Sequence, residues 1–238
     1  MSGHSKWKTI KHKKAATDAK RSKEFSKLIK EITVAARTGG GDPSANSRLR
    51  TLLDKARMIN MPNENAIRAI KKGTGELPGV SYEEFMYEGY GPGGIAVLVE
   101  TLTDNKNKAV AQLRHAFTKN GGNLAESGAV SWMFERLGVI RIEDTDLNED
   151  ELLEKLLDYD IKDIIKDDSS YLIMCNMKSL EKVKQALKRE NLNITEADVE
   201  WVAKNPHQLD KKNEGKAIDF LQAIEELDDV QNVYTNLG

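Results

Sequence analysis

The sequence contains a single cysteine, Cys175, among 238 residues. One cysteine can neither form a disulfide within the chain nor supply the thiolates of a zinc site, so a disulfide-stapled secreted protein is excluded and a reducing cytosol is compatible. Its neighbours, Tyr171 to Met174, predict a buried strand, in which a free thiol behaves as a small hydrophobe. We therefore expect Cys175 to be a structural residue of a core.

Long apolar stretches are also missing. No hydrophobic run of 18 residues appears in the sequence, which excludes a membrane-spanning helix. The first 20 residues contain no apolar run, so they do not predict a signal peptide, and their Lys-rich pattern with acids soon after does not fit a mitochondrial transit peptide. We expect a soluble, cytoplasmic protein with no membrane partner. The absence of heptads favours a monomer.

Catalytic and metal-binding motifs are scarce. The histidines, which are His4, His12, His115 and His207, do not have the spacing of metal ligands. No Ser-His-Asp, Cys-His or paired-carboxylate motif can be singled out. We therefore predict no catalytic residue, no metal and no cofactor, and a protein that is not an enzyme.

One glycine-rich string does match a nucleotide-binding expression. Residues Gly89 to Gly94, GYGPGG in one-letter code, satisfy G-x-G-x-x-G. The dinucleotide fingerprint needs a helix after the glycines, whereas the apolar run at 95–99 predicts a strand. A kinase phosphate loop does lie between strands, but the chain has no H-R-D or D-F-G string. The string predicts a tight turn between strands, and a phosphoryl-transfer enzyme is a hypothesis that rests on it alone.

Charge is abundant, and it is divided between the two ends of the chain. Residues 1–75 carry 18 Lys and Arg against six Asp and Glu, whereas residues 76–238 carry 18 against 32. A segment of +12 is thus joined to one of −14, which the net charge of −2 hides. A basic end is typical of a protein that grips a polyanion. Nucleic acid is the commonest one, because a duplex presents one negative charge about every 1.7 Å.

The basic residues begin at 6–14, where five lysines lie within nine residues beside Trp7. Lysines attract phosphate without regard to sequence, and the Trp7 ring either stacks on a base or packs on the helices that follow. A phosphate partner would relieve the self-repulsion of so many cations. We predict that the basic side chains converge on one exterior surface that contacts nucleic acid. The predicted contact residues are Lys6, Trp7, Lys8, Lys11, Lys13, Lys14, Lys20, Arg21, Lys23, Lys27, Arg48, Arg50, Lys55, Arg57, Arg68, Lys71 and Lys72.

A polar turn at 103–108 is a secondary candidate. Asn105, Lys106 and Lys108 lie between a predicted strand and a predicted helix. One interpretation is a helix cap formed by Asp104 or Asn105, since Asx residues are the usual caps. The other is a loop that offers Asn and Lys to phosphates or bases.

Hydrophobic spacing predicts three helices in the basic region. Apolar residues recur every three to four positions over 17–38 and mark the first helix. Asp42 and Pro43 predict the cap and first residue of the second helix, and Pro62 opens the third. Three amphipathic helices with short connections make a small bundle, which we assign to a basic helical domain of residues 1–78.

After a linker the spacing changes towards strands. The predicted elements are strands at 85–90, 95–102 and 129–135 and a helix at 106–120. This unit lacks a second helix and a last strand, which a helix at 217–227 and a strand at 230–234 would supply. We therefore predict a discontinuous α/β domain formed by residues 79–136 plus 204–238.

The residues between these two parts form a complete alternating unit. Its predicted elements are strands at 139–142, 161–166, 171–176 and 194–202 and helices at 149–157 and 180–190. The order β-α-β-β-α-β is ferredoxin-like. The predicted fold class is α+β: an N-terminal three-helix bundle followed by two ferredoxin-like α/β domains, the last of which, residues 137–203, is inserted into the middle one.

Several strings, in order along the chain, closely resemble the YebC/PmpR family. They are GHSKW at 3–7, KR at 20–21, GGGDP at 39–43, NMP at 60–62, YEGYGPGG at 87–94, LTDN at 102–105 and DDVQNVY at 228–234. The likeness runs from end to end and is weakest over 145–210. Lys106 and Lys108 stand where relatives often carry Arg, which keeps the charge but loses bidentate geometry.

The resemblance implies a helical bundle and two α/β domains in a cytoplasmic bacterial protein that is not an enzyme. It implies transcriptional regulation through DNA binding. Mitochondrial relatives look like translational activators, and bacterial relatives also look like ribosome-associated factors that aid elongation through proline-rich stretches. With the charge division, it predicts a DNA-binding regulator of transcription; the alternative is an RNA- or ribosome-associated translation factor, because phosphate attraction does not separate DNA from RNA.

Overall fold

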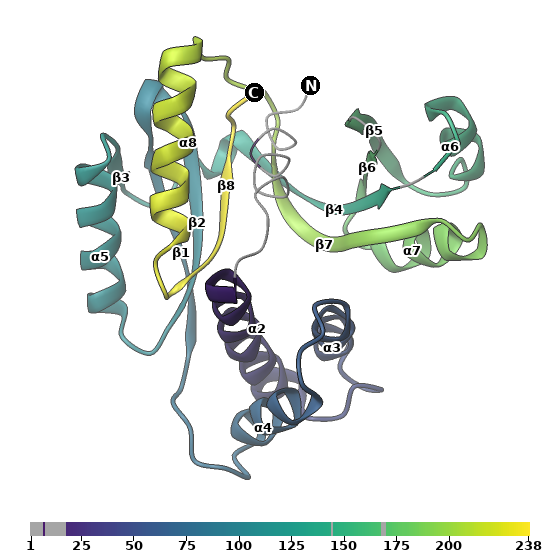
Figure 1. Cartoon of the computed structure of the whole chain (residues 1–238), viewed down its shortest axis with the longest axis horizontal. Helices are drawn as coiled ribbons and strands as arrows, with labels where there is room; N and C mark the ends of the chain where they lie inside the picture. Colours follow the sequence, from purple (N-terminus) through teal and green to yellow (C-terminus); the bar gives the residue numbers. More distant parts are fainter. Residues whose placement is uncertain (1–6, 8–17, 144, 168–169) are drawn as a thin grey trace.

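The computed structural model describes Trp7 and residues 18–143, 145–167 and 170–238 (Figure 1). The helices are α2 (Asp18–Gly39), α3 (Ser47–Met58), α4 (Asn63–Thr74), α5 (Lys106–Lys119), α6 (Glu149–Lys155), α7 (Leu180–Arg189) and α8 (Lys211–Glu225), with short 3-10 turns η1 (Pro92–Gly94) and η2 (Ser131–Met133). The strands are β1 (Glu83–Tyr90), β2 (Ala96–Thr103), β3 (Asn123–Ala125), β4 (Phe134–Glu143), β5 (Ile161–Asp167), β6 (Ser170–Asn176), β7 (Asn193–Ala203) and β8 (Val230–Thr235).

The first three helices pack as a bundle, as the spacing predicts. The apolar stripe of α2 contributes Leu28 and Ile32 to a core shared with Leu49 of α3 and Ala66 of α4. Gly75, with φ of 85°, takes the left-handed conformation that ends α4. The polar faces of all three helices are left outside this core.

The second helix begins later than predicted. Asp42 does not cap it, because its carboxylate accepts a hydrogen bond from the Ser44 N–H at 2.9 Å and closes a turn instead. The cap is Asn46, whose side-chain oxygen accepts from the Leu49 N–H at 3.0 Å. The Asn46 amide also donates to the Ala35 carbonyl of α2 at 2.8 Å, so one side chain both caps α3 and fixes the connection.

The first sheet has the strand order β3-β1-β2-β8, with all neighbours antiparallel. Helices α5 and α8 cover one face, where Phe117 and Phe220 meet edge to face at a centroid distance of 5.0 Å (Figure 1). Two helices on one face of a four-stranded antiparallel sheet are the layers of a ferredoxin-like unit, but the elements follow one another here as β-β-α-β-α-β and not as β-α-β-β-α-β.

The second sheet has the order β5-β6-β4-β7, again antiparallel, with α6 and α7 on one face. This is the ferredoxin-like arrangement that the alternating pattern predicts. Cys175 is fully buried in β6 as expected, and burial raises the pKa of its thiol to about 11. The predicted strand at 129–135 is wrong in part, because 131–133 form η2 and β4 runs unbroken from Phe134 through Gly138 to Glu143.

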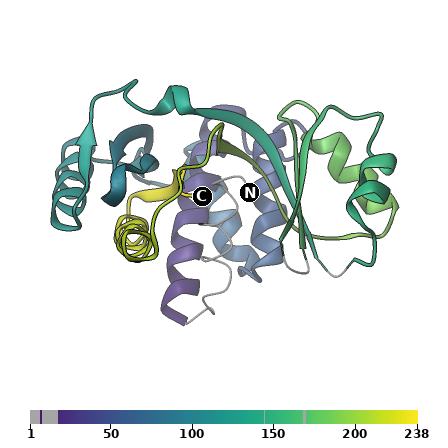
Figure 2. The same ribbon diagram turned by 90° about the horizontal axis from the view of Figure 1, so that it is seen from above.

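The two sheets are joined by an apolar cluster that includes Leu98, Phe134, Ala203 and Tyr234. Seen from above, they lie on opposite sides of the molecule, and β4 and β7 extend between them (Figure 2). The helical bundle lies below both sheets in Figure 1. None of the helices in the described ranges is long and apolar enough to cross a membrane.

Candidate nucleic-acid interface

The amino-terminal lysines lie outside the described residues. These are Lys6, Lys8, Lys11, Lys13 and Lys14, and of Lys20 and Arg21 only the backbone, within α2, is described. Trp7 is described, and it is 3% exposed within the core that the first sheet forms with α5 and α8. The prediction that Trp7 packs on the bundle is therefore wrong, because the ring packs in this other core. Its contact with a base stays a prediction, although burial leaves little of the ring surface open for stacking.

Lys30 of α2 docks the bundle onto the first sheet. Its ammonium lies 2.8 Å from Asp229 Oδ1, and both side chains are only 16% exposed. It also donates to the Asp228 carbonyl at 3.0 Å and lies 5.5 Å from the centre of the Tyr82 ring. A cation held by a carboxylate, a carbonyl and a ring is not free to bind phosphate.

Two of the predicted contact residues, Lys23 and Lys27, are also engaged at this junction. The Lys27 ammonium donates to the carbonyls of Glu225 and Gln231, both at 3.3 Å. Lys23 lies 4.0 Å from the carboxylate of Asp228, which is 95% exposed. The cationic row of α2 thus faces the end of α8 and the start of β8.

Lys55 of α3 connects the bundle to the second sheet. Its ammonium lies 3.5 Å from Asp198 Oδ2 of β7. Burial by itself lowers the pKa of Lys55, but the carboxylates of Asp198, Glu31 and Glu196 outweigh it and raise that pKa above its usual value. Burial raises the pKa of Glu31, and Lys55 opposes that rise. Lys55 therefore serves as the counterion of a group of acids between three elements.

Other arginines of the bundle have partners as well. Arg48 pairs with Glu84 of β1, and Arg57 lies 2.8 Å from Asp54 one turn earlier in its own helix. Arg50 donates to the carbonyl of Pro43 at 2.9 Å. A carbonyl carries no net charge, so Arg50 keeps its full charge while its position is fixed.

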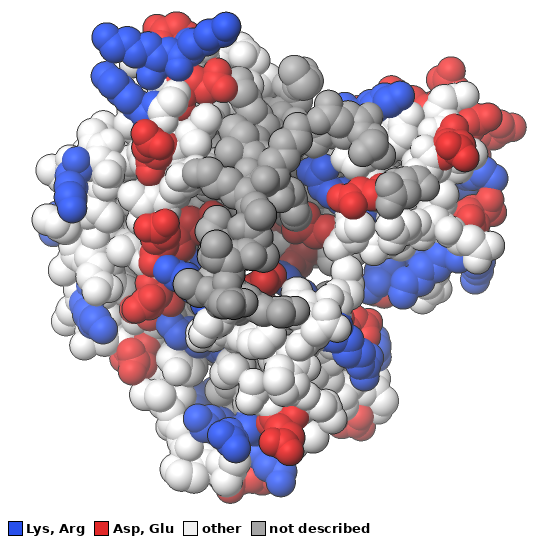
Figure 3. Space-filling model, in the orientation of Figure 1, with Lys and Arg blue, Asp and Glu red and all other residues white. Residues whose placement is uncertain are grey.

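The outer face of α4 carries three cations. Arg68, Lys71 and Lys72 are all exposed and, at spacings of three and four residues, lie on one side of the helix. Among the described residues none of the three pairs with a carboxylate. Lys and Arg atoms are visible over α4 at the bottom of Figure 3. This face is the best-defined candidate surface for phosphate.

The described cations are not gathered in one patch on the face shown in Figure 3, and the convergence predicted for the whole set, which includes residues 6–14, stays a prediction. On the face shown in Figure 3, Lys and Arg are spread over α4, over α7 and at the upper end of α8. The cations of α7, Lys182, Lys188 and Arg189, are exposed and were not among the predicted contacts. They were overlooked because residues 76–238 carry more acids than bases, and a charge balance summed over a region does not reveal a single helix face that is basic.

The polar turn at 103–108 is a helix cap. Asn105 precedes α5, and its side-chain oxygen accepts from the Lys108 N–H at 3.0 Å. The Lys106 ammonium lies 4.8 Å from the centre of the Phe85 ring, and the Lys108 side chain is exposed. The cap interpretation is therefore confirmed, and the side chains of Lys106 and Lys108 are both exposed.

The glycine-rich string forms the tight turn that we predicted. The Gly91 N–H donates to the Ile95 carbonyl at 2.8 Å, and Gly93 has φ of 75° inside η1. Strand β2 follows at once, so the string does not lead into a helix as the dinucleotide fingerprint requires. In the described part of the chain no three His, Cys, Asp or Glu side chains are grouped so as to hold a metal ion.

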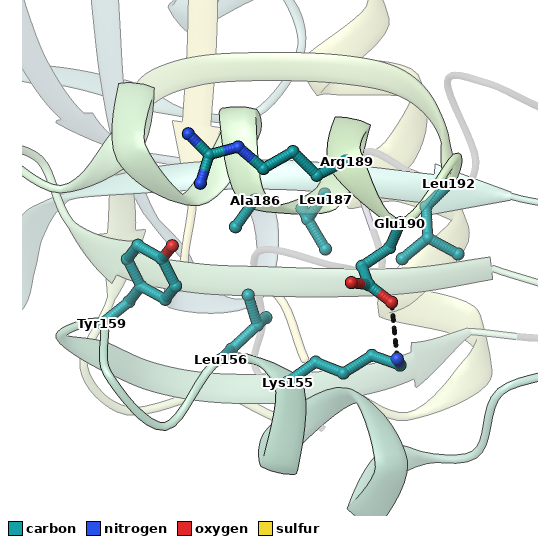
Figure 4. Close-up of a pocket in the computed structure, with 8 residues that line it drawn as sticks. All are labelled: Lys155, Leu156, Tyr159, Ala186, Leu187, Arg189, Glu190 and Leu192. Carbon is teal, nitrogen blue, oxygen red and sulfur yellow. Dashed lines mark hydrogen bonds and ion pairs between the residues drawn. The ribbon is translucent and has the colours of Figure 1, made fainter.

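A pocket between α6 and the end of α7 has a volume of about 150 Å³ (Figure 4). Leu156 and Leu187 line it, and the ammonium of Lys155 lies 2.5 Å from Glu190 Oε2 at its edge. Small-molecule sites usually measure about 300–1,000 Å³. The pocket is smaller than such sites, and Lys155 and Glu190 at its edge are paired with each other, so it is not favoured over the α4 surface as the candidate site.

Comparison with known proteins places the chain in a family. The TACO1/YebC protein N-terminal domain matches residues 5–76, and the TACO1/YebC second and third domain matches residues 82–237. The chain belongs to the TACO1/YebC family. The TACO1/YebC match is interrupted at 77–81, in the connection between α4 and β1.

Relatives match over the full length of this TACO1/YebC chain. A probable transcriptional regulatory protein of Chlorobaculum tepidum is 51% identical over 238 residues, covering 100% of this chain and 95% of the relative. One from Desulfosudis oleivorans is 51% identical over 236 residues, covering 99% and 96%. The crystal structure of a conserved hypothetical protein from Aquifex aeolicus superposes with a TM-score of 0.87 at 47% identity, covering 96% of this chain and 95% of that one.

Proposed function

We propose that this protein is a non-enzymatic nucleic-acid-binding regulator of transcription that binds DNA through its basic helical bundle. The observation that carries the proposal is the exposed row of Arg68, Lys71 and Lys72 on α4, which has no acidic partner in the described ranges. Relatives that match over nearly their full length are named probable transcriptional regulatory proteins, which supports the regulatory part.

Some basic residues of the bundle contact the rest of the chain and others are exposed, and this difference supports a phosphate-binding surface on α4. Lys27, Lys30 and Lys55 face the acidic remainder of the chain and hold the bundle in place. The α4 row points away from that junction, with Lys71 and Lys72 in the last turn of the helix. Phosphate contacts of this kind give affinity and orientation without reading sequence.

The salt dependence of binding tests the proposal. If about six phosphates are engaged, the log–log slope of duplex DNA affinity against salt should be near −5. Replacing Arg68, Lys71 and Lys72 together by Gln should weaken binding and make the slope less steep by about 2.7, because each phosphate contact contributes about 0.9. The matched control replaces the α7 cations, Lys182, Lys188 and Arg189, by Gln and should leave the slope unchanged.

Two results would contradict the proposal in different ways. A flat salt response of the wild-type protein would rule out a phosphate clamp. Equal losses in the α4 and α7 variants would show that only overall charge matters. The same titration with RNA and with ribosomes decides the target, since strong binding there without DNA binding would overturn the transcriptional part.

A further inference from the structure

Trp132 is exposed in a way that is unusual for a large aromatic residue. It lies in η2 and is 64% exposed, whereas tryptophan is highly buried on average. Its indole N–H donates to the Ala129 carbonyl at 3.1 Å. The hydroxyl of Tyr90, itself 36% exposed, donates to the same carbonyl oxygen at 3.2 Å. One oxygen therefore holds the polar ends of two exposed aromatic rings.

The loop that carries Trp132 is fixed by a buried carboxylate. Glu88 of β1 is 4% exposed and accepts from the N–H groups of Gly128 and Val130, both at 2.7 Å, and of Ser131 at 2.9 Å. Three backbone donors on one carboxylate set the path of residues 128–131. The exposed indole is thus presented by a rigid support, which lowers the entropy that a partner must remove on binding.

A cation lies next to the backbone of this residue. The Lys204 ammonium donates to the Trp132 carbonyl at 2.8 Å, and the Lys204 N–H donates to the Met133 carbonyl at 2.9 Å. The side chain is exposed, and a carbonyl does not neutralise it. An aromatic surface beside a positioned positive charge is the combination that single-stranded nucleic acid uses, with a base on the ring and its phosphate on the cation.

We propose that Trp132, with Tyr90 beside it, is a stacking platform for an unpaired nucleobase, and that Lys204 binds the adjoining phosphate. This proposal rests on the proposed function and adds that the nucleic acid includes a single-stranded part. Bases within a duplex are already stacked on each other, so only an unpaired base offers its face. The platform belongs to the α/β part of the chain, apart from the α4 row.

Tryptophan fluorescence allows a direct test with the full-length protein. Of the three tryptophans, Trp7 is 3% exposed and Trp201 is partly buried, so Trp132 is the main target of a quencher in solution. Single-stranded oligonucleotides of mixed sequence, as RNA and as DNA, should quench this emission. Trp132→Ala should weaken their binding about ten- to a hundredfold and leave duplex binding unchanged. Trp132→Phe keeps a ring and should retain most of the affinity.

Two further variants separate the possible results. Leu157→Ala removes an exposed apolar side chain, 69% exposed, that lies next to the second sheet. It should change neither the oligonucleotide affinity nor the quenching of tryptophan emission. The α4 Gln variant should weaken duplex and single-stranded binding alike. If the wild type binds oligonucleotides but Trp132→Ala changes neither affinity nor quenching, the platform is wrong, a protein partner becomes the better assignment, and the proposed function stands. If the wild type binds no nucleic acid, both proposals fall.

Discussion

Glu88 shows how a single buried carboxylate makes stability depend on pH. Burial opposes its ionisation, but the N–H groups of Gly128, Val130 and Ser131 outweigh burial and hold the pKa below its usual value. We expect Glu88→Gln to destabilise the protein by about 1.5–3 kcal/mol at pH 7, since hydrogen bonds to a charged group are lost. Urea unfolding measures this difference.

The pH dependence of that loss has a definite sign. Because the folded-state pKa is lowered, the stabilisation by Glu88 is complete above the unfolded value of about 4.3 and disappears as pH falls through the folded value. The difference between wild type and Glu88→Gln should therefore shrink below pH 4. Glu126→Gln, an exposed change on the same loop, is the control and should have little effect. A difference that does not shrink as pH falls below 4 would contradict the ionic explanation.

Individual residues were predicted best where one physical property decides their place. Cys175 sits in an apolar strand, and it is buried as expected. Trp7 and Trp132 have the same side chain, but one is 3% and the other 64% exposed. The basic neighbours of Trp7 suggested stacking, whereas the exposure of Trp132 depends on Glu88, more than 40 residues away. Local sequence does not contain that information.

Helix packing predicts that Gly→Ala lowers the stability of the protein at one helical position and raises it at another. Gly73 of α4 lies so close to α2 that an added Cβ would be 2.3 Å from the Thr33 carbonyl oxygen and 2.8 Å from Ala36 Cβ. Gly→Ala in a helix normally stabilises, but here the overpacking should prevail and destabilise the protein by about 1–3 kcal/mol. Urea unfolding of Gly73→Ala measures the change.

Gly215→Ala is the matched control within α8. No atom lies within 4 Å of the Cβ that it would gain, and its backbone is helical. This change should stabilise the protein by about 0.4–1 kcal/mol through the unfolded chain's entropy. If both substitutions shifted stability in the same direction, the close approach of α4 to α2 would not be the cause.

The positions of helices and strands were predictable where the hydrophobic periodicity was strong, but the residues at which these elements begin and end were not. The pattern placed the helix α8 at 217–227, but Asp210 caps it and it begins at Lys211, so it passes through Gly215. Strands were predicted at 129–135 and 139–142, whereas one strand, β4, covers 134–143, and within it Gly138 lies opposite Cys175, where a larger side chain would meet the sulfur. In each case the element continues through a glycine that packs closely or is tolerated.

At the scale of the whole molecule, the sequence predicted the helical bundle and the ferredoxin-like strand order but not how the bundle is held. The partners of its cations are far away along the chain, as with Lys30 and Asp229, which are 199 residues apart. A charge count treats such lysines as free, although the fold neutralises them. The same count overlooked the exposed cations of α7. Regional charge therefore overestimates the surface available for phosphate.

The pair of Lys30 and Asp229 gives the last prediction, on the assembly of the molecule. Lys30→Met keeps the length of the side chain but leaves the buried carboxylate of Asp229 with the Thr103 hydroxyl, at 3.0 Å, as its donor. Removing one member of a buried pair should cost about 2–3 kcal/mol and loosen the bundle from the sheet. Urea unfolding and protease cleavage in the connection at 75–82 would report these effects.

Lys23→Met is the control. Its partner Asp228 is 95% exposed and lies 4.0 Å from the Lys23 ammonium, and such pairs contribute about 0–1 kcal/mol. Adding Asp229→Asn to Lys30→Met should recover part of the loss, since the unpaired charge is then gone. If Lys30→Met and Lys23→Met behaved alike, the bundle would be held mainly by apolar contacts, and its lysines would again be available for phosphate.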